Sequence, residues 1–160
     1  MLVRRTILCA ATVLGLVGAA AADDLVPALR TPMPAKYRQE CAACHVAYPP
    51  ALLPVASWRR LLSDLPHHFG TDASLDPATL QELNAWLGAN AADQRRTRRG
   101  QVAVPPDDRI TRSPWFVREH DDVAPATWKL PAVKSPSNCV ACHRQAEQGV
   151  FDERNVRIPR

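Results

Sequence analysis

The chain begins with one apolar run, which residues 7–22 form behind Arg4 and Arg5. The run ends in three alanines and is followed by two aspartates. Only this first part of the chain approaches the length of a spanning helix, but a basic start, a short apolar stretch and a small-residue end are typical of an export signal and not of a transmembrane anchor. We therefore expect residues 1–22 to be removed and the mature, periplasmic chain to begin near Asp23.

Two amphipathic patterns follow in the next part of the chain. The first predicts a helix that Ser57 caps and Pro66 ends, with an apolar face formed by Trp58, Leu61, Leu62 and Leu65. The second pattern begins at Asp76 and Pro77, a cap residue and a proline at the first helical position, and it continues to about Asn90. Both patterns predict short surface helices with one buried face.

The rest of the pattern predicts shorter elements. Residues 35–45 form a short helix, Ser113 caps a second helix that continues to His120, and Ser137 caps a third that Gly149 ends. With 15 prolines and 6 glycines in 160 residues, long helices are not expected. The sequence therefore predicts a mainly α fold, with much irregular structure in its C-terminal part.

The composition changes between the two halves. Residues 93–106 contain four closely spaced arginines and end in two prolines. We interpret this stretch as a linker between one unit at residues 23–92 and another at residues 107–160. The arginines are either a solvated linker surface or a docking patch for an acidic partner.

The charge of the mature chain limits its partners. Removal of the leader halves the formal net charge of +4, because the leader contains two arginines and no acidic residue. So small an excess does not provide a phosphate-neutralising surface, and we expect no nucleic-acid partner. We also expect no membrane span in the mature form, and a monomer.

The leader also removes one of five cysteines, and the other four form two C-x-x-C pairs. Each pair is followed directly by histidine, in Cys41-Ala-Ala-Cys44-His45 and in Cys139-Val-Ala-Cys142-His143. This is the attachment signature of a c-type haem, in which the thiols bind the vinyl groups and the histidine binds the iron. Zinc bound by four thiolates and a thiol-redox pair are the alternatives, but neither pair follows the strand of a thioredoxin-like unit.

Each haem iron needs a second axial ligand, and the mature chain offers few. Met33 is the last remaining methionine, and it would have to turn back over the attachment site only eight residues later. The histidines outside the two motifs are His67, His68 and His120. We therefore expect histidine on both faces of the irons. A methionine ligand would raise the potential, so its absence predicts two low-potential centres.

The position of each histidine suggests which haem it serves. His68 directly precedes Phe69 and Gly70, where glycine lets the chain bend toward a flat ring. We favour His68 over His67 for the first haem on this ground, and His67 remains the alternative. His120 is the only other histidine in the C-terminal unit besides the one in the motif, so we expect it to bind the second iron.

Four segments, at residues 41–50, 68–75, 109–120 and 139–149, resemble the small dihaem cytochrome c family. The resemblance implies a class I cytochrome c domain, an unusual C-terminal haem domain, and electron donation to a small oxygen-binding mono-haem cytochrome c. A membrane cytochrome is the implied donor. The ligand sets it implies are Cys41, Cys44, His45 and His68 for the first haem, and Cys139, Cys142, His143 and His120 for the second.

The expected function is electron transfer without substrate chemistry, so we expect no enzyme and no catalytic residue. Tyr48 follows the first motif closely and lies either between the haems or over one porphyrin edge. A small dihaem subunit of a periplasmic reductase of the nitrate reductase type is the nearest alternative. A haem peroxidase or gas sensor is the other, and it requires one iron with an open position.

Overall fold

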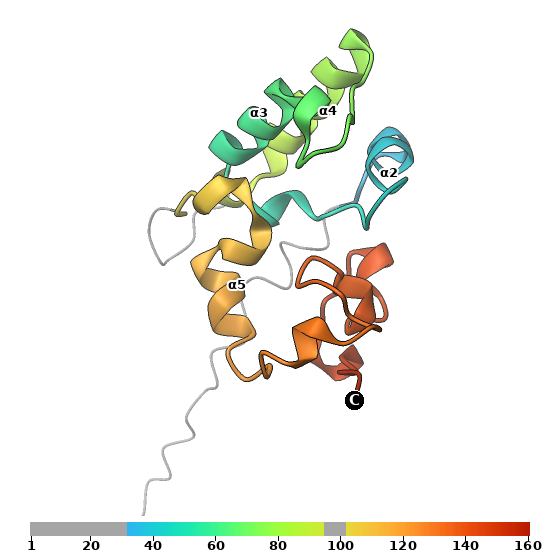
Figure 1. Ribbon diagram of the computed structural model, residues 1–160. Helices are drawn as coiled ribbons and strands as arrows, with labels where there is room; N and C mark the ends of the chain where they lie inside the picture. Colours follow the sequence, from blue (N-terminus) through green and yellow to red (C-terminus); the bar gives the residue numbers. More distant parts are fainter. Residues whose placement is uncertain (1–31, 95–101) are drawn as a thin grey trace, which may run out of the picture.

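The computed structural model describes residues 32–94, here the first unit, and residues 102–160, here the second unit. The two units lie one above the other (Figure 1). Their described residues form α-helices, 3-10 turns and two isolated bridges, with no named strand among them, which confirms the mainly α prediction. No helix in these ranges is long and apolar enough to cross a membrane. The expected leader and the linker arginines lie outside the described residues.

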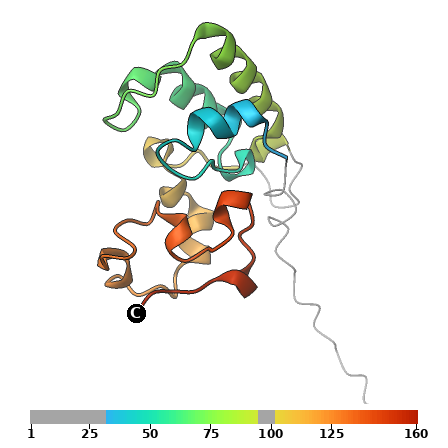
Figure 2. The same ribbon diagram turned by 90° about the vertical axis from the view of Figure 1, so that its right-hand side faces the viewer.

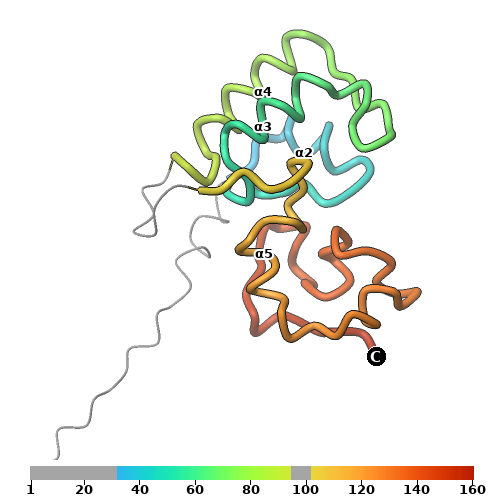
Figure 3. Tube along the Cα trace, turned by 60° about the vertical axis from the view of Figure 1, so that its left-hand side comes forward, coloured from blue at the N-terminus to red at the C-terminus, as the bar shows by residue number. Residues whose placement is uncertain are grey.

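The first unit is built from α2 (Ala35–Cys41), α3 (Val55–Ser63) and α4 (Pro77–Asn90). Figure 3 shows α3 and α4 side by side, with α2 next to them. Leu83 and Leu87, one turn apart on α4, are 0% and 1% exposed because they face this contact. They belong to a core formed by Tyr37, Ala47, Leu53, Trp58, Leu83, Leu87 and Ala91.

The α4 prediction is confirmed at both ends. Asp76 is the N-cap, and its Oδ1 accepts hydrogen bonds from the amides of Ala78 and Thr79, each at 3.0 Å. Pro77 occupies the first helical position, where a missing N–H costs no bond. The helix ends at Asn90, as the pattern indicates.

Two other helix predictions were wrong at their ends. The helix containing Trp58 begins at Val55 after Pro54, so Ser57 is a buried residue inside it and not its cap. This helix ends at Ser63, and a 3-10 turn, η2 (Leu65–His67), takes over where the proline disfavours α-helix in the preceding residue.

The helix expected over residues 35–45 was also too long. It ends at Cys41, so Cys44 and His45 lie in the turn after α2. Of the first cysteine pair, only Cys41 therefore lies on a helix.

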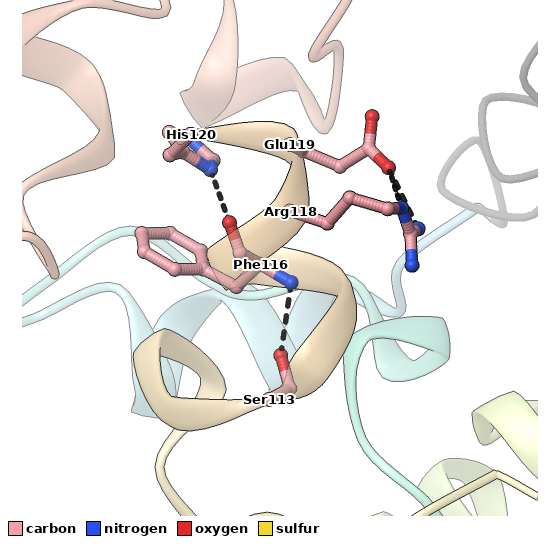
Figure 4. A network of polar contacts seen from close by, with 5 residues as sticks. All are labelled: Ser113, Phe116, Arg118, Glu119 and His120. Atoms are coloured by element: carbon pink, nitrogen blue, oxygen red, sulfur yellow. Dashed lines mark hydrogen bonds and ion pairs between the residues drawn. The ribbon is translucent and has the colours of Figure 1, made fainter. Parts of the chain in front are cut away.

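The second unit has one α-helix, α5 (Pro114–Glu119), in its described residues. Ser113 caps this helix as predicted, because its hydroxyl accepts a hydrogen bond from the Phe116 amide at 3.4 Å (Figure 4). The remaining elements are single 3-10 turns: η4 (Pro106–Asp108), η5 (Ile110–Arg112), η6 (Thr127–Lys129), η7 (Cys139–Ala141), η8 (Ala146–Gln148) and η9 (Glu153–Asn155).

The expected helix at the second cysteine pair does not form. The chain makes η7 and η8 instead, and Asn138, not Ser137, precedes the first of them. Gly149 ends η8 with a φ of 73°, a left-handed conformation that glycine adopts freely, so this part of the prediction is confirmed.

The units meet along the segment that follows α2. A short turn, η1 (Pro50–Leu52), places Ala51 and Leu52 in a small apolar cluster whose other members are Tyr48, Ile110, Trp115 and Phe151. Trp115 Nε1 donates to the Leu52 carbonyl at 3.4 Å. These contacts fix the loop after α2 against the second unit. Figure 2 shows the backbone of the two units from a second direction.

Replacing Asp76 with alanine is expected to lower the stability of the haem-loaded protein at neutral pH. Hydrogen bonds from Thr79, first from its side chain and then from its amide, lower the pKa of Asp76 below 3.8. The stabilisation is therefore complete above the unfolded pKa of 3.8 and is lost as the pH falls through the lower, native pKa. Urea unfolding should show a lower midpoint for the variant at pH 7, with the difference closing below pH 3.8.

Glu82→Ala is the matched control, because Glu82 is an exposed carboxylate in the middle of α4. It should change the midpoint little at any pH. Equal losses for the two variants at pH 7 would show that the cap does not stabilise α4.

Candidate functional site

The four predicted attachment cysteines lie at the ends of short elements. Cys41 ends α2, Cys44 is exposed in the turn after it, Cys139 begins η7 and Cys142 follows that turn. None of the four forms a disulfide. Both Cys41 and Cys139 are partly buried, and this burial raises the pKa of each thiol to about 11.

No group of three or more histidine, cysteine, aspartate or glutamate residues in the described ranges is arranged to hold a metal ion. The two cysteine pairs belong to different units, which agrees with a separate role for each pair.

The structure brings His45 and His68 together in the first unit. Their ring centroids are 6.3 Å apart and their planes are inclined by 31°. His45 comes from the turn after α2, and His68 follows η2. A metal held between two imidazoles, at about 2 Å per metal–nitrogen bond, separates the ring centres by about 6 Å. The spacing therefore fits one metal centre between the rings.

The second unit repeats this arrangement with His120 and His143. Their centroids are 6.0 Å apart, with an interplanar angle of 66°. His120 is the C-cap of α5, and His143 directly follows the second cysteine pair. Each C-x-x-C-H motif thus faces one distant histidine.

One ring in each pair is oriented by a backbone carbonyl. Nδ1 of His45 donates to the Val46 carbonyl at 2.8 Å, and Nδ1 of His120 donates to the Phe116 carbonyl at 2.9 Å (Figure 4). A hydrogen bond at Nδ1 fixes the tautomer whose lone pair is on Nε2, the nitrogen that remains free for a metal.

The other ring in each pair has a buried nitrogen without a protein partner. Nδ1 of His68 and Nδ1 of His143 make no hydrogen bond within the described structure. Burial, and then the facing histidine, lower the pKa of both rings. Both effects favour the neutral imidazole, which is the form that binds a metal. The site residues therefore fit two bis-histidine haem centres.

His67 points away from this arrangement. Its side chain is 80% exposed, and Nδ1 donates to Asp64 Oδ1 at 2.7 Å. This hydrogen bond, followed by the charge of Asp64, raises the pKa of His67. The structure thus brings His68 and not its neighbour to His45, while Met33 packs against the core of the first unit.

Tyr48 lies where the two units meet. Its ring stacks on His45, with centroids 4.8 Å apart and planes inclined by 24°. Its hydroxyl donates to the Ser137 carbonyl at 2.9 Å, two residues before Cys139. Burial, with a smaller contribution from Cys139, raises the pKa of Tyr48 to about 12, so the phenol stays neutral and can donate.

Three aromatic neighbours of the second site were not predicted, and one of them is Trp128, 6.0 Å from the His120 ring. Phe116 stacks on His120 with centroids 4.0 Å apart, and Phe151 lies 5.3 Å from the His143 ring. The four-residue spacing of Phe116 and His120 on one helix face could have indicated their contact. The contact with Phe151 is made by the returning C-terminal segment, which no local spacing indicates.

The chain is similar to proteins described as dihaem cytochromes c. The sequence model of the family described as dihaem cytochrome c matches residues 37–151. A diheme cytochrome c from Rhodobacter sphaeroides is 48% identical, with a TM-score of 0.66, over 74% of this chain and 97% of that one. A diheme cytochrome type c from Shewanella baltica OS155 is 38% identical, with a TM-score of 0.67, over 81% and 95% of the two chains.

No curated protein matches the chain significantly. The family match covers well over half of the chain, and both solved structures are matched over nearly their whole length. The match to this family implies two covalently bound c-type haems, one for each C-x-x-C-H motif. The chain belongs to the dihaem cytochrome c family.

Proposed function

We propose that this protein is an electron-transfer relay in which each haem iron is held between two histidines. His45 and His68 would bind the first iron, and His143 and His120 the second. A c-type haem supplies a reversible one-electron couple at its iron. The observation that carries the proposal is the facing of paired imidazoles at 6.3 and 6.0 Å, each pair joining one motif histidine to a distant one.

This ligation favours electron relay over catalysis. With an imidazole on both faces, neither iron would keep an open position for oxygen or peroxide. A peroxidase or a gas sensor needs such a position. The carbonyl contacts of His45 and His120 hold their rings in the ligating tautomer.

Tyr48 connects the two sites. Its ring contacts His45 and its hydroxyl contacts the backbone just before Cys139, so it spans the boundary between the units. We assign it as the residue that fixes the first motif against the second. The Tyr37 hydroxyl, which donates to the Tyr48 carbonyl at 2.7 Å, anchors the backbone of Tyr48 to the core of the first unit.

The location and partners in this proposal rest on the leader and on the family resemblance. A basic start and an apolar run at residues 1–22 support export to the periplasm. The partners we propose are a small oxygen-binding mono-haem cytochrome c as acceptor and a membrane cytochrome as donor, with the protein acting as a monomer.

Carbon monoxide tests the relay directly. The reduced wild-type protein should show no rapid carbon monoxide spectrum at either haem, because both axial positions are filled. Rapid binding at either haem would overturn the relay assignment and favour the gas-sensor alternative.

His68→Ala and His120→Ala should each open one iron, and each should bind carbon monoxide at one of the two haems. His67→Ala is the matched control and should stay inert, because His67 is exposed and paired with Asp64. If His67→Ala bound carbon monoxide and His68→Ala did not, the first ligand would be His67.

Potentiometric titration should find both wild-type midpoints below those of histidine/methionine cytochromes c. His68→Met should raise only the midpoint potential of the first haem. The rise should be a sizeable part of the roughly 0.8 V over which axial ligands set haem potentials. A high wild-type midpoint would contradict the bis-histidine assignment and point to Met33.

Two substitutions of Tyr48 separate its ring from its hydroxyl. Tyr48→Phe keeps the stack on His45 and loses the hydrogen bond to the Ser137 carbonyl. The free energy of unfolding should therefore fall by about 1 kcal/mol. Tyr48→Leu also loses the ring, and electron equilibration between the haems after pulse reduction should slow more than in Tyr48→Phe. Unchanged equilibration in Tyr48→Leu would show that Tyr48 only packs.

A further inference from the structure

The turn that presents His68 has a strained residue at its centre. Phe69 and Gly70 have φ values of 50° and 92°, and the Thr71 amide donates to the His68 carbonyl at 3.0 Å. Positive φ at both central positions is the type I′ turn, in which asparagine and glycine are preferred. Gly70 fits this turn, whereas phenylalanine adopts a positive φ only when its surroundings hold it there.

The Phe69 side chain is not held by burial, since it is 47% exposed. One neighbour of its ring is His68, at 4.9 Å between centroids. Another is the guanidinium of Arg109, whose central carbon lies 4.3 Å from the ring centroid. This is a cation–π contact, and it joins the second unit to the ligand turn of the first.

Arg109 is placed by a segment that is itself fixed on the first unit. Asp108 accepts hydrogen bonds from Arg60 on α3, from Nε at 2.8 Å and from Nη2 at 2.6 Å. The Arg60 guanidinium holds the pKa of Asp108 below its usual value, so this bidentate pair is charged at neutral pH. Asp107 and Asp108 both have a φ of 53°, and Asp107 pairs with Arg112. Figure 3 shows this segment running beside the first unit before the chain turns to α5.

Two successive residues of the second unit therefore contact the first unit, one on α3 and one on the His68 turn. The Arg60–Asp108 pair fixes the backbone immediately before Arg109. The Arg109 guanidinium is therefore already placed near the Phe69 ring. A preorganised contact of this kind loses less side-chain entropy than a free surface pair.

We propose that Arg109 is a positioning residue for His68: by packing on Phe69 it holds the strained turn closed and slows the departure of His68 from the first iron. The proposal rests on the bis-histidine function proposed above. It makes the first haem site dependent on a residue of the second unit.

The test compares Arg109→Ala, Arg109→Lys and the wild type as haem-loaded proteins. Loss of an exposed cation–π contact should accelerate carbon monoxide binding about three- to fivefold, at one haem only. Hydrogen exchange of the Thr71 amide, which reports opening of the turn, should rise by a similar factor. Arg109→Lys keeps a cation and should fall between the wild type and Arg109→Ala.

Arg59→Ala is the matched control, because it removes one exposed guanidinium from α3 and should leave both rates unchanged. Phe69→Leu should reproduce Arg109→Ala, and the double variant should add nothing further. Wild-type rates in Arg109→Ala would overturn the positioning role alone, since the relay would still stand. Rapid binding in the wild type itself would instead overturn the proposed function.

Discussion

The structure depends on one constraint, that two imidazoles from distant parts of the chain must face each other about 6 Å apart, twice. In each unit one imidazole, His45 or His143, directly follows the cysteine pair. The other arrives on a separate element, after η2 for His68 and at the end of α5 for His120. A metal between the rings can tolerate little error in this spacing. The Ser113 cap of α5, the carbonyl contacts of His45 and His120, and the turn at His68 all restrict the positions of these imidazoles.

The two units differ in the size of the apolar core that supports their paired imidazoles. The first unit has a packed core of seven buried residues, which come from its three helices and from the segments next to them. The buried apolar residues of the second unit, within its described part, are Phe116, Val133 and Ala146. So small a core does not stabilise a unit of this size. We therefore expect the second unit to need its covalently attached haem for folding, and its aromatic contacts gather around His120 and His143 for the same reason.

The units also stabilise each other's ligand elements. Tyr48 contacts His45 with its ring and the backbone before Cys139 with its hydroxyl. Trp115 and Phe151 of the second unit pack against the apolar cluster at η1. On another side, Arg60–Asp108 and Arg109–Phe69 join the second unit to α3 and to the His68 turn. Loops that carry ligands but have little core of their own are thus held from the neighbouring unit.

The sequence by itself determined what depends on local spacing: the two C-x-x-C-H motifs, the Asp76 cap of α4, and the helix from Ser113 that delivers His120. It misplaced the caps at Ser57 and Ser137, because serine in a favourable position caps a helix only if the backbone begins there. Only the tertiary structure decided that His68 faces His45, that Tyr48 reaches Ser137, and that Arg109 lies on Phe69. Spacing along the chain specifies contacts within a turn or two, whereas these pairs meet only after the units have packed.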